Sequence, residues 1–216
     1  MKNTLENKKS KLKANFNKFV PDDFVDFIVD LLIEYPIKFK IVPPRRTKLG
    51  DFKYGTKLEK PEITINGDLN PYSFLITTLH EFAHLHTYLE YGNKVAPHGK
   101  EWKKNFQKLL LPIIESKKLP KDIESVLISS IQNIKAASCS DMNLSRVLKM
   151  YDENKEGIEL LERLPKNAIF VLSGKKFIKG DLRRKRYLCT EIISKRQYLV
   201  NALAEVIPIN DERNER

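Results

Sequence analysis

The chain has 216 residues, 41% of them hydrophobic and 31% charged, and its 39 Lys and Arg against 28 Asp and Glu give a formal net charge of +11. This composition is that of a globular protein, and the length allows one substantial core with a small appended module. The polar N-terminus does not resemble a signal peptide and no stretch reaches membrane-spanning length, so we expect a cytoplasmic protein that does not enter a membrane. Its two cysteines, Cys139 and Cys189, are expected to be reduced thiols.

The first predicted elements are a helix and a small sheet. Residues 1–19 form a basic segment, and Pro21 then offers a start for a helix whose apolar residues recur at helical spacing as far as Tyr35. We interpret this helix as one that packs on the core. Three strand-like segments follow it and predict a three-stranded sheet: residues 39–42, 48–54 and 62–66.

A His-Glu-x-x-His motif occupies residues 80–84, inside an apolar run with helical character. Residues four apart lie on one face of a helix, so His80 and His84 can direct a ring nitrogen to the same ion while Glu81 lies beside it. In zinc enzymes with this motif the ion polarises a water molecule and the glutamate removes its proton. A purely structural pair of surface histidines is the alternative, and we favour a metal site.

The apolar residues of this helix gather on the side opposite the two histidines. They are Leu75, Leu79, Phe82, Leu85 and Leu89. The pattern therefore predicts that His80 and His84 share the face that does not enter the hydrophobic core.

A catalytic zinc usually has three protein ligands, and the chain has only two other histidines. His86 lies about 200° around the helix from His84 and points toward the apolar flank, so we predict a structural role for it. His98 follows Gly92, a plausible helix terminator, and a returning loop would bring it to the metal. Taken alone, His98 would be interpreted as an exposed loop histidine, but the motif upstream favours a third ligand.

Helical patterns continue after His98. Trp102 begins an apolar stripe that runs to Ile113, and we interpret it as a core anchor beneath the metal loop rather than as a substrate platform. Two further helices are predicted near residues 122–134 and 142–151.

These elements together resemble the SprT-like zinc metallopeptidase family, whose domain is shared with the eukaryotic protease Spartan. The similar segments are residues 49–52, 63–66, 77–84, 91–93 and 98–103, and the resemblance covers roughly residues 20–110. It implies that His80, His84 and His98 bind one catalytic Zn²⁺ and that Glu81 is the general base. It also implies cleavage of proteins, which in Spartan-like members are crosslinked to DNA.

The C-terminal part departs from that family, many of whose members end in a zinc ribbon with two cysteine pairs. Here neither cysteine belongs to a CxxC pair, so a second zinc is not expected. Strand-like segments instead predict a small antiparallel sheet: residues 168–172, 176–178, 187–190 and 197–200. Residues 173–174 and 179–181 are the expected turns between them.

Positive charge is concentrated in this C-terminal sheet. The run Arg183, Arg184, Lys185 and Arg186 is a tentative nucleic-acid-binding site, because cations there can neutralise phosphates. Under strand alternation Arg184 and Arg186 would share one face, and Arg183 and Lys185 the other. The alternative is a merely solvated basic surface.

We therefore expect an α+β fold with a zincin-like metallopeptidase domain, followed by helices and an antiparallel β module. The expected parts are residues 1–19 as a basic segment, 20–117 as the SprT-like domain, 118–165 as a helical connector and 166–216 as the basic β module. The favoured function is that of a zinc metallopeptidase acting on a protein or peptide substrate near DNA, in the cytoplasm or at the nucleoid. A general cytosolic peptidase and a non-catalytic zinc-binding protein associated with DNA or transcription remain alternatives.

Overall fold

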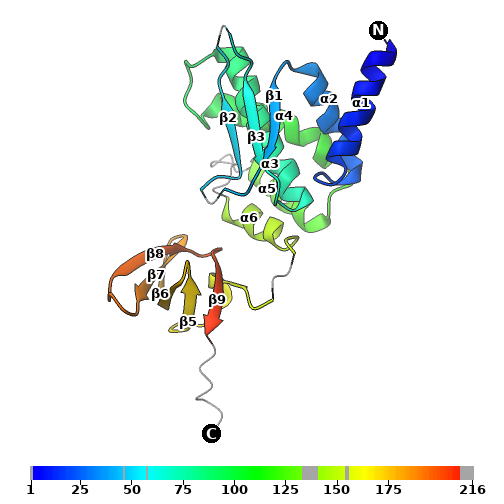
Figure 1. Ribbon diagram of the computed structural model, residues 1–216. Coiled ribbons are helices and arrows are strands. Elements are labelled where there is room, and N and C mark those ends of the chain that lie inside the picture. The colour runs from blue at the N-terminus through cyan, green and yellow to red at the C-terminus, as the bar shows by residue number, and fades with distance from the viewer. Residues whose placement is uncertain (1, 46, 57, 133–140, 154–155, 210–216) are drawn as a thin grey trace. The chain divides into compact units, whose positions relative to one another are not determined.

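The computed structural model describes residues 2–45, 47–56, 58–132, 141–153 and 156–209. It divides into two compact units, Met1–Asp152 and Glu153–Arg216 (Figure 1). The first unit combines helices with a three-stranded sheet, and the second is built around a six-stranded sheet. The predicted α+β class is therefore confirmed.

The sheet of the first unit lies where the sequence predicts it. Its strands are β1 (Lys38–Val42), β2 (Gly50–Lys53) and β3 (Glu62–Asn66), in the order β1-β3-β2. β1 is parallel to the central strand β3 and β2 is antiparallel to it. Ile63 and Ile65 of β3 are fully buried, whereas β2 pairs with β3 alone among the strands described and so forms an edge.

Helix α3 (Pro71–Tyr91) carries the His-Glu-x-x-His motif. The side chain of Asn70 accepts a hydrogen bond from the Ser73 amide at 2.9 Å, which caps the N-terminus, and Pro71 needs no amide partner at the first position. Gly92, with φ of 60°, ends the helix as predicted. α3 packs against β2, β3 and α4, and Figure 1 shows it at the centre of the first unit.

The remaining helices of the first unit surround α3 and the sheet. They are α1 (Lys2–Phe16), α2 (Val25–Glu34), α4 (Lys100–Glu115), α5 (Lys121–Gln132) and α6 (Met142–Lys149). The sequence pattern does not predict α1, because its polar residues carry little helical periodicity. Leu12 and the buried ring of Phe16 join α1 to the core, and exposed ion pairs link it to α2, Lys9 to Asp30 and Lys13 to Asp26, both at 2.5 Å.

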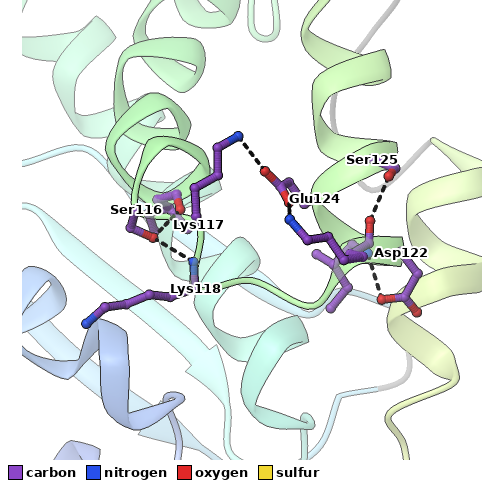
Figure 2. A network of polar contacts seen from close by, with 9 residues as sticks. Ser116, Lys117, Lys118, Asp122, Glu124 and Ser125 are labelled. Atoms are coloured by element: carbon purple, nitrogen blue, oxygen red, sulfur yellow. Dashed lines mark hydrogen bonds and ion pairs between the residues drawn. The ribbon is translucent and has the colours of Figure 1, made fainter.

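The turn between α4 and α5 is stabilised by polar contacts (Figure 2). The ammonium groups of Lys117 and Lys121 approach the two carboxylate oxygens of Glu124 at 2.7 and 2.9 Å. Beyond this turn, apolar residues of α5 and α6, including Ile123 and Leu144, join the same hydrophobic core as α3. The predicted helical connector is thus divided: its described residues up to Asp152 belong to the first unit, whereas Leu161 lies in the core of the second. Residues 133–140 lie outside the described part.

The second unit has a sheet with the strand order β4-β9-β5-β6-β7-β8, antiparallel at each of its pairings. Its strands are β4 (Glu159–Leu160), β5 (Ile169–Leu172), β6 (Lys175–Arg183), β7 (Arg186–Glu191), β8 (Gln197–Asn201) and β9 (Glu205–Ile209). The predicted antiparallel sheet is confirmed, and β4 and β9 extend it beyond the four predicted strands. One buried cluster, which includes Phe170, Phe177 and Cys189, forms its core.

One predicted turn in this sheet is correct and the other is wrong. Ser173 and Gly174 form the β5–β6 turn, with φ of 51° and 77°. Residues 179–181, predicted as a turn, lie within β6 at an irregularity of the pairing with β7. The chain reverses instead at Arg184, which has φ of 60°, and Lys185. The proposed strand alternation of the basic run is therefore wrong, because two of its four residues form a turn.

Gly180 explains this difference. A Cβ atom at Gly180 would lie 2.2 Å from the carbonyl oxygen of Leu188 on the adjacent strand. The glycine thus permits a close backbone approach at a bulge rather than a chain reversal. A glycine inside an alternating pattern is compatible with either structure, so the local sequence does not distinguish them.

Among the residues described, no helix has both the length and the apolar character needed to cross a bilayer. Cys189 is a free and fully buried thiol. Cys139 lies outside the described residues.

We predict that Gly180→Ala destabilises the β6–β7 hairpin, because the new methyl group must displace backbone. The expected loss is about 1–3 kcal/mol, the usual cost of overpacking. Hydrogen exchange of peptides from residues 175–191, measured by mass spectrometry on the full chain, should show faster exchange. Gly174→Asn is the matched control, because φ there is 77° with no atom within 4 Å of the added Cβ, and asparagine tolerates this conformation. Equal exchange rates in the two variants would contradict the bulge explanation.

Candidate metal centre

Three histidine side chains converge in a cleft of the first unit. His80 and His84 come from successive turns of α3, and His98 comes from the loop that precedes α4. Their Nε2 atoms lie 3.2 Å apart for His80 and His84, 3.0 Å for His84 and His98, and 3.1 Å for His80 and His98. This group could hold a metal ion.

The donor set fits zinc. Three ligands at tetrahedral positions, each about 2.0–2.1 Å from one ion, place their nitrogen atoms about 3.3 Å apart. The observed separations of 3.0–3.2 Å are close to that value. Three neutral imidazoles are also a donor set that zinc enzymes use while keeping a further position open for water.

Withdrawal from water favours the neutral form of these imidazoles, most strongly for the buried His80 and less for the half-buried His84 and the exposed His98. Desolvation, with a smaller effect of neighbouring histidines, lowers the pKa of His80 to about 3 and that of His84 to about 4. Burial also lowers the pKa of His98. At neutral pH the three rings therefore have free lone pairs, which is the form that binds a metal.

An aromatic floor covers the inner side of the cluster. The ring of Trp102 lies 4.6 Å from His80, 5.3 Å from His84 and 4.7 Å from His98, measured between centroids, and Phe106 stacks beneath it at 5.0 Å. Trp102 is fully buried, as expected of a core anchor. The predicted placement on a face outside the core is wrong for His80, because α4 adds a second apolar layer there and leaves it only 6% exposed, whereas His84 is half-buried and lines the cleft.

His86 lies apart from the cluster. Its ring contacts Tyr35 at 4.9 Å and Phe82 at 6.5 Å between centroids, on the other side of α3. This is the apolar flank on which the sequence placed it.

The side chain of Glu81, which belongs to α3, lies against the start of β2. A Cβ atom at Gly50 would lie 2.6 Å from Oε1 of Glu81 and 2.8 Å from Cγ2 of Thr77, so only glycine allows β2 to approach α3 this closely. Burial, with a smaller effect of the Asp51 carboxylate, raises the pKa of Glu81 to about 8 against the opposing charges of Arg45 and Lys48. Positive charge brought to the histidines would favour the ionised carboxylate.

The loop before β2 is fixed by Asn66, a residue that sequence reasoning did not identify. The side-chain nitrogen Nδ2 of Asn66 donates to the carbonyl oxygens of Arg45 at 3.2 Å and Lys48 at 3.0 Å. The side-chain oxygen Oδ1 accepts a hydrogen bond from Nε of Arg45 at 2.8 Å. Asn66 is 1% exposed. In the sequence, Asn66 is visible only as a polar residue at the end of an apolar strand segment, and this pattern does not predict its hydrogen-bond partners.

The histidines open into a cleft of about 530 Å³. Its walls are the 47–49 loop, β2, and the loop residues Pro97 and His98. Beside His84, three further aromatic rings form what we call the aromatic shelf: Phe52, Tyr54 and Tyr88. Their centroids are 5.3 Å apart for Phe52 and Tyr54, 6.0 Å for Phe52 and Tyr88, and 5.0 Å for Tyr54 and Tyr88.

The basic run belongs to the second unit. Arg183 and Arg186 face each other across the β6–β7 pair, and Arg184 and Lys185 form the turn between them. The structure thus gathers all four residues at the tip of one hairpin.

Comparison with known proteins finds a family match for the part of the chain that contains the three clustered histidines. No curated protein and no solved structure matches the chain. The model of the SprT-like family matches residues 34–119, a range that includes β1 to β3, α3, α4 and all three clustered histidines. Residues 34–119 are therefore a domain of the SprT-like family.

Proposed function

We propose that this protein is a zinc-dependent metallopeptidase with a zincin-like active site. The observation that carries the proposal is the convergence of three imidazole Nε2 atoms within 3.0–3.2 Å, next to Glu81 and open to a cleft. The match of residues 34–119 to the SprT-like family supports it independently.

In this mechanism His80, His84 and His98 hold the zinc ion. When bound, zinc lowers the pKa of a water molecule and polarises the carbonyl of the scissile peptide bond. Glu81 accepts the proton of the attacking water and passes it to the departing amine. The contact with Gly50 keeps the Glu81 carboxyl at the edge of the cleft, where an extended substrate would lie.

A non-catalytic zinc protein is the weaker alternative. Structural zinc sites are commonly closed by a fourth protein ligand, whereas the cluster found among the described residues contains three histidines and borders a cleft. A carboxyl group that is buried beside the cluster and also lines the cleft suits a general base.

A second proposal concerns where the peptidase acts. Between residues 166 and 209 the chain has ten Lys and Arg and three Asp and Glu, and the hairpin tip carries four of these cations in succession. We propose that this tip binds nucleic-acid phosphates and directs a cytoplasmic peptidase to proteins associated with nucleic acid.

The metal assignment predicts about one zinc per chain in the purified protein. His98→Ala should weaken zinc binding by roughly 100-fold or more, since disturbing only the groups around ligands already costs 10–100-fold. His86→Ala should leave it unchanged, because that ring lies on the other side of α3. Elemental analysis and competition with a zinc-binding dye would measure both. Equal zinc retention by the two variants would exclude His98 as a ligand.

The base assignment predicts that Glu81→Gln keeps zinc but lowers peptide hydrolysis by about 100-fold or more, because the amide cannot accept the proton. Removing zinc with a chelator should abolish hydrolysis by the unmodified protein, and adding zinc should restore it. Glu90→Gln, on the same helix but outside the cleft lining, is the control and should retain activity. Undiminished cleavage by the Glu81→Gln protein, purified free of other proteases, would eliminate the mechanism.

The hairpin assignment predicts that replacing Arg183, Arg184, Lys185 and Arg186 together by glutamine weakens DNA binding. The slope of log affinity against log salt should fall in magnitude by up to about 3.6, since each of the four cations can neutralise one phosphate and each neutralised phosphate contributes about 0.9. Fluorescence titrations at several salt concentrations would measure this.

The control for the hairpin variant replaces four exposed lysines of the first unit, Lys8, Lys11, Lys18 and Lys38, by glutamine. It removes the same charge from another surface and should preserve most of the slope. An equal loss in both variants would attribute binding to diffuse positive charge, and zinc content should be unaffected in either.

A further inference from the structure

We infer that the aromatic shelf is the subsite that selects the substrate, by binding an apolar side chain, preferentially an aromatic one, next to the scissile bond. This inference rests on the proposed peptidase function and specifies its substrate class. The shelf consists of Phe52 and Tyr54, which belong to β2 and the segment after it, and Tyr88 of α3.

The shelf begins at the metal cluster. The Phe52 ring is stacked on the His84 ring at 6.3 Å between centroids, with only 5° between their planes. Gly50, two residues earlier, contacts Glu81. Alternate residues of a strand share a face, so Gly50, Phe52 and Tyr54 all face α3. Along the helix, Gly50 lies against Glu81, Phe52 against His84 and Tyr54 against Tyr88. A side chain on the shelf would therefore lie beside the bond to be cleaved.

The shelf presents apolar surface that other described residues do not cover. Tyr54 is 54% exposed, although its ring packs on Tyr88, and it lines both the main cleft and a smaller pocket behind His84. The Tyr88 hydroxyl donates to the carbonyl oxygen of Gly55 at 3.3 Å, which ties the end of β2 to α3. Rings held in this way offer a preformed surface on which a substrate ring can pack edge to face or offset.

The opposite end of the cleft has a different chemistry. There, Thr47 and an ion pair between Lys48 and Asp51, 2.9 Å long, line the wall near Glu81. The cleft is thus charged at one end and aromatic at the other, with the metal cluster between. An ionised carboxylate placed on the shelf would lose water without gaining a partner, so acidic side chains should be rejected there.

The test uses a peptide library in which cleavage products are mapped by mass spectrometry, followed by kinetics on matched peptides. The peptides differ only at the selected position, which carries Phe, Leu, Ala, Asp or Arg. We expect kcat/KM to be about 10- to 200-fold higher for Phe or Leu than for Ala, the usual range for an apolar subsite, and lowest for Asp. The preference should occupy one fixed position relative to the cleaved bond.

Three variants connect this preference to the shelf. Tyr54→Ala should lower kcat/KM for the Phe peptide about tenfold or more while leaving the Ala peptide nearly unchanged, and Tyr54→Phe should restore the preference. Tyr91→Ala removes a partly exposed tyrosine of the same helix that lines neither pocket, and it should behave as the unmodified protein. Zinc content, measured for each variant, verifies that the cluster is intact.

A binding measurement separates this inference from the proposed function. The Glu81→Gln protein loaded with zinc should bind the Phe peptide more tightly than the Ala peptide, and the additional Tyr54→Ala change should remove the difference. If that binding preference is found but the unmodified protein cleaves nothing, the peptidase function fails and the shelf remains a peptide-binding site. Cleavage without a preference, a preference for Arg, or a preference unaffected by Tyr54→Ala would overturn the inference.

Discussion

The close approach of β2 to α3 is the contact on which the geometry of the site depends. The approach is possible because Gly50 has no side chain where any Cβ would meet the Glu81 carboxyl. It brings the edge of the sheet over the motif helix, so the cleft has the strand as one wall and the histidines as its floor. A larger residue in place of Gly50 would both separate β2 from α3 and displace the Glu81 carboxyl.

Burial near this contact changes the pKa values of the histidines and of Glu81 in opposite directions. On the inner side, Trp102 and Phe106 pack on the buried ring of His80 and favour its neutral form by keeping water away. On the outer side, burial of Glu81 raises its pKa, so that its charge depends on what occupies the cluster. The same apolar packing that stabilises the domain therefore also prepares the protonation states that metal binding requires.

Much of the fold and the cluster could be predicted because their signals are local. The spacing of His80 and His84 follows from helical geometry, and Gly92 marks where α3 ends and a loop toward His98 can begin. The burial of the histidine face could not be predicted, since it depends on α4 packing from elsewhere in the chain. The same limit applies to the contacts of Gly50 and Asn66, which are tertiary, and to Gly180, where only the pairing with β7 distinguishes a bulge from a turn.

The core of the C-terminal unit contains an unusual cation. Lys179 is 3% exposed, lies over the Tyr187 ring at 4.0 Å, and donates to the carbonyl oxygens of Glu162 at 3.2 Å and Leu164 at 2.5 Å. Burial lowers the pKa of its ammonium group, a cost that these contacts offset. Small domains often rely on disulfides or structural metals to join segments distant in sequence. In this module the side chain of Lys179 has the same role as such a cross-link. It joins strand β6 to residues 162–164 by hydrogen bonds that its ammonium group donates, without a disulfide or a metal ion.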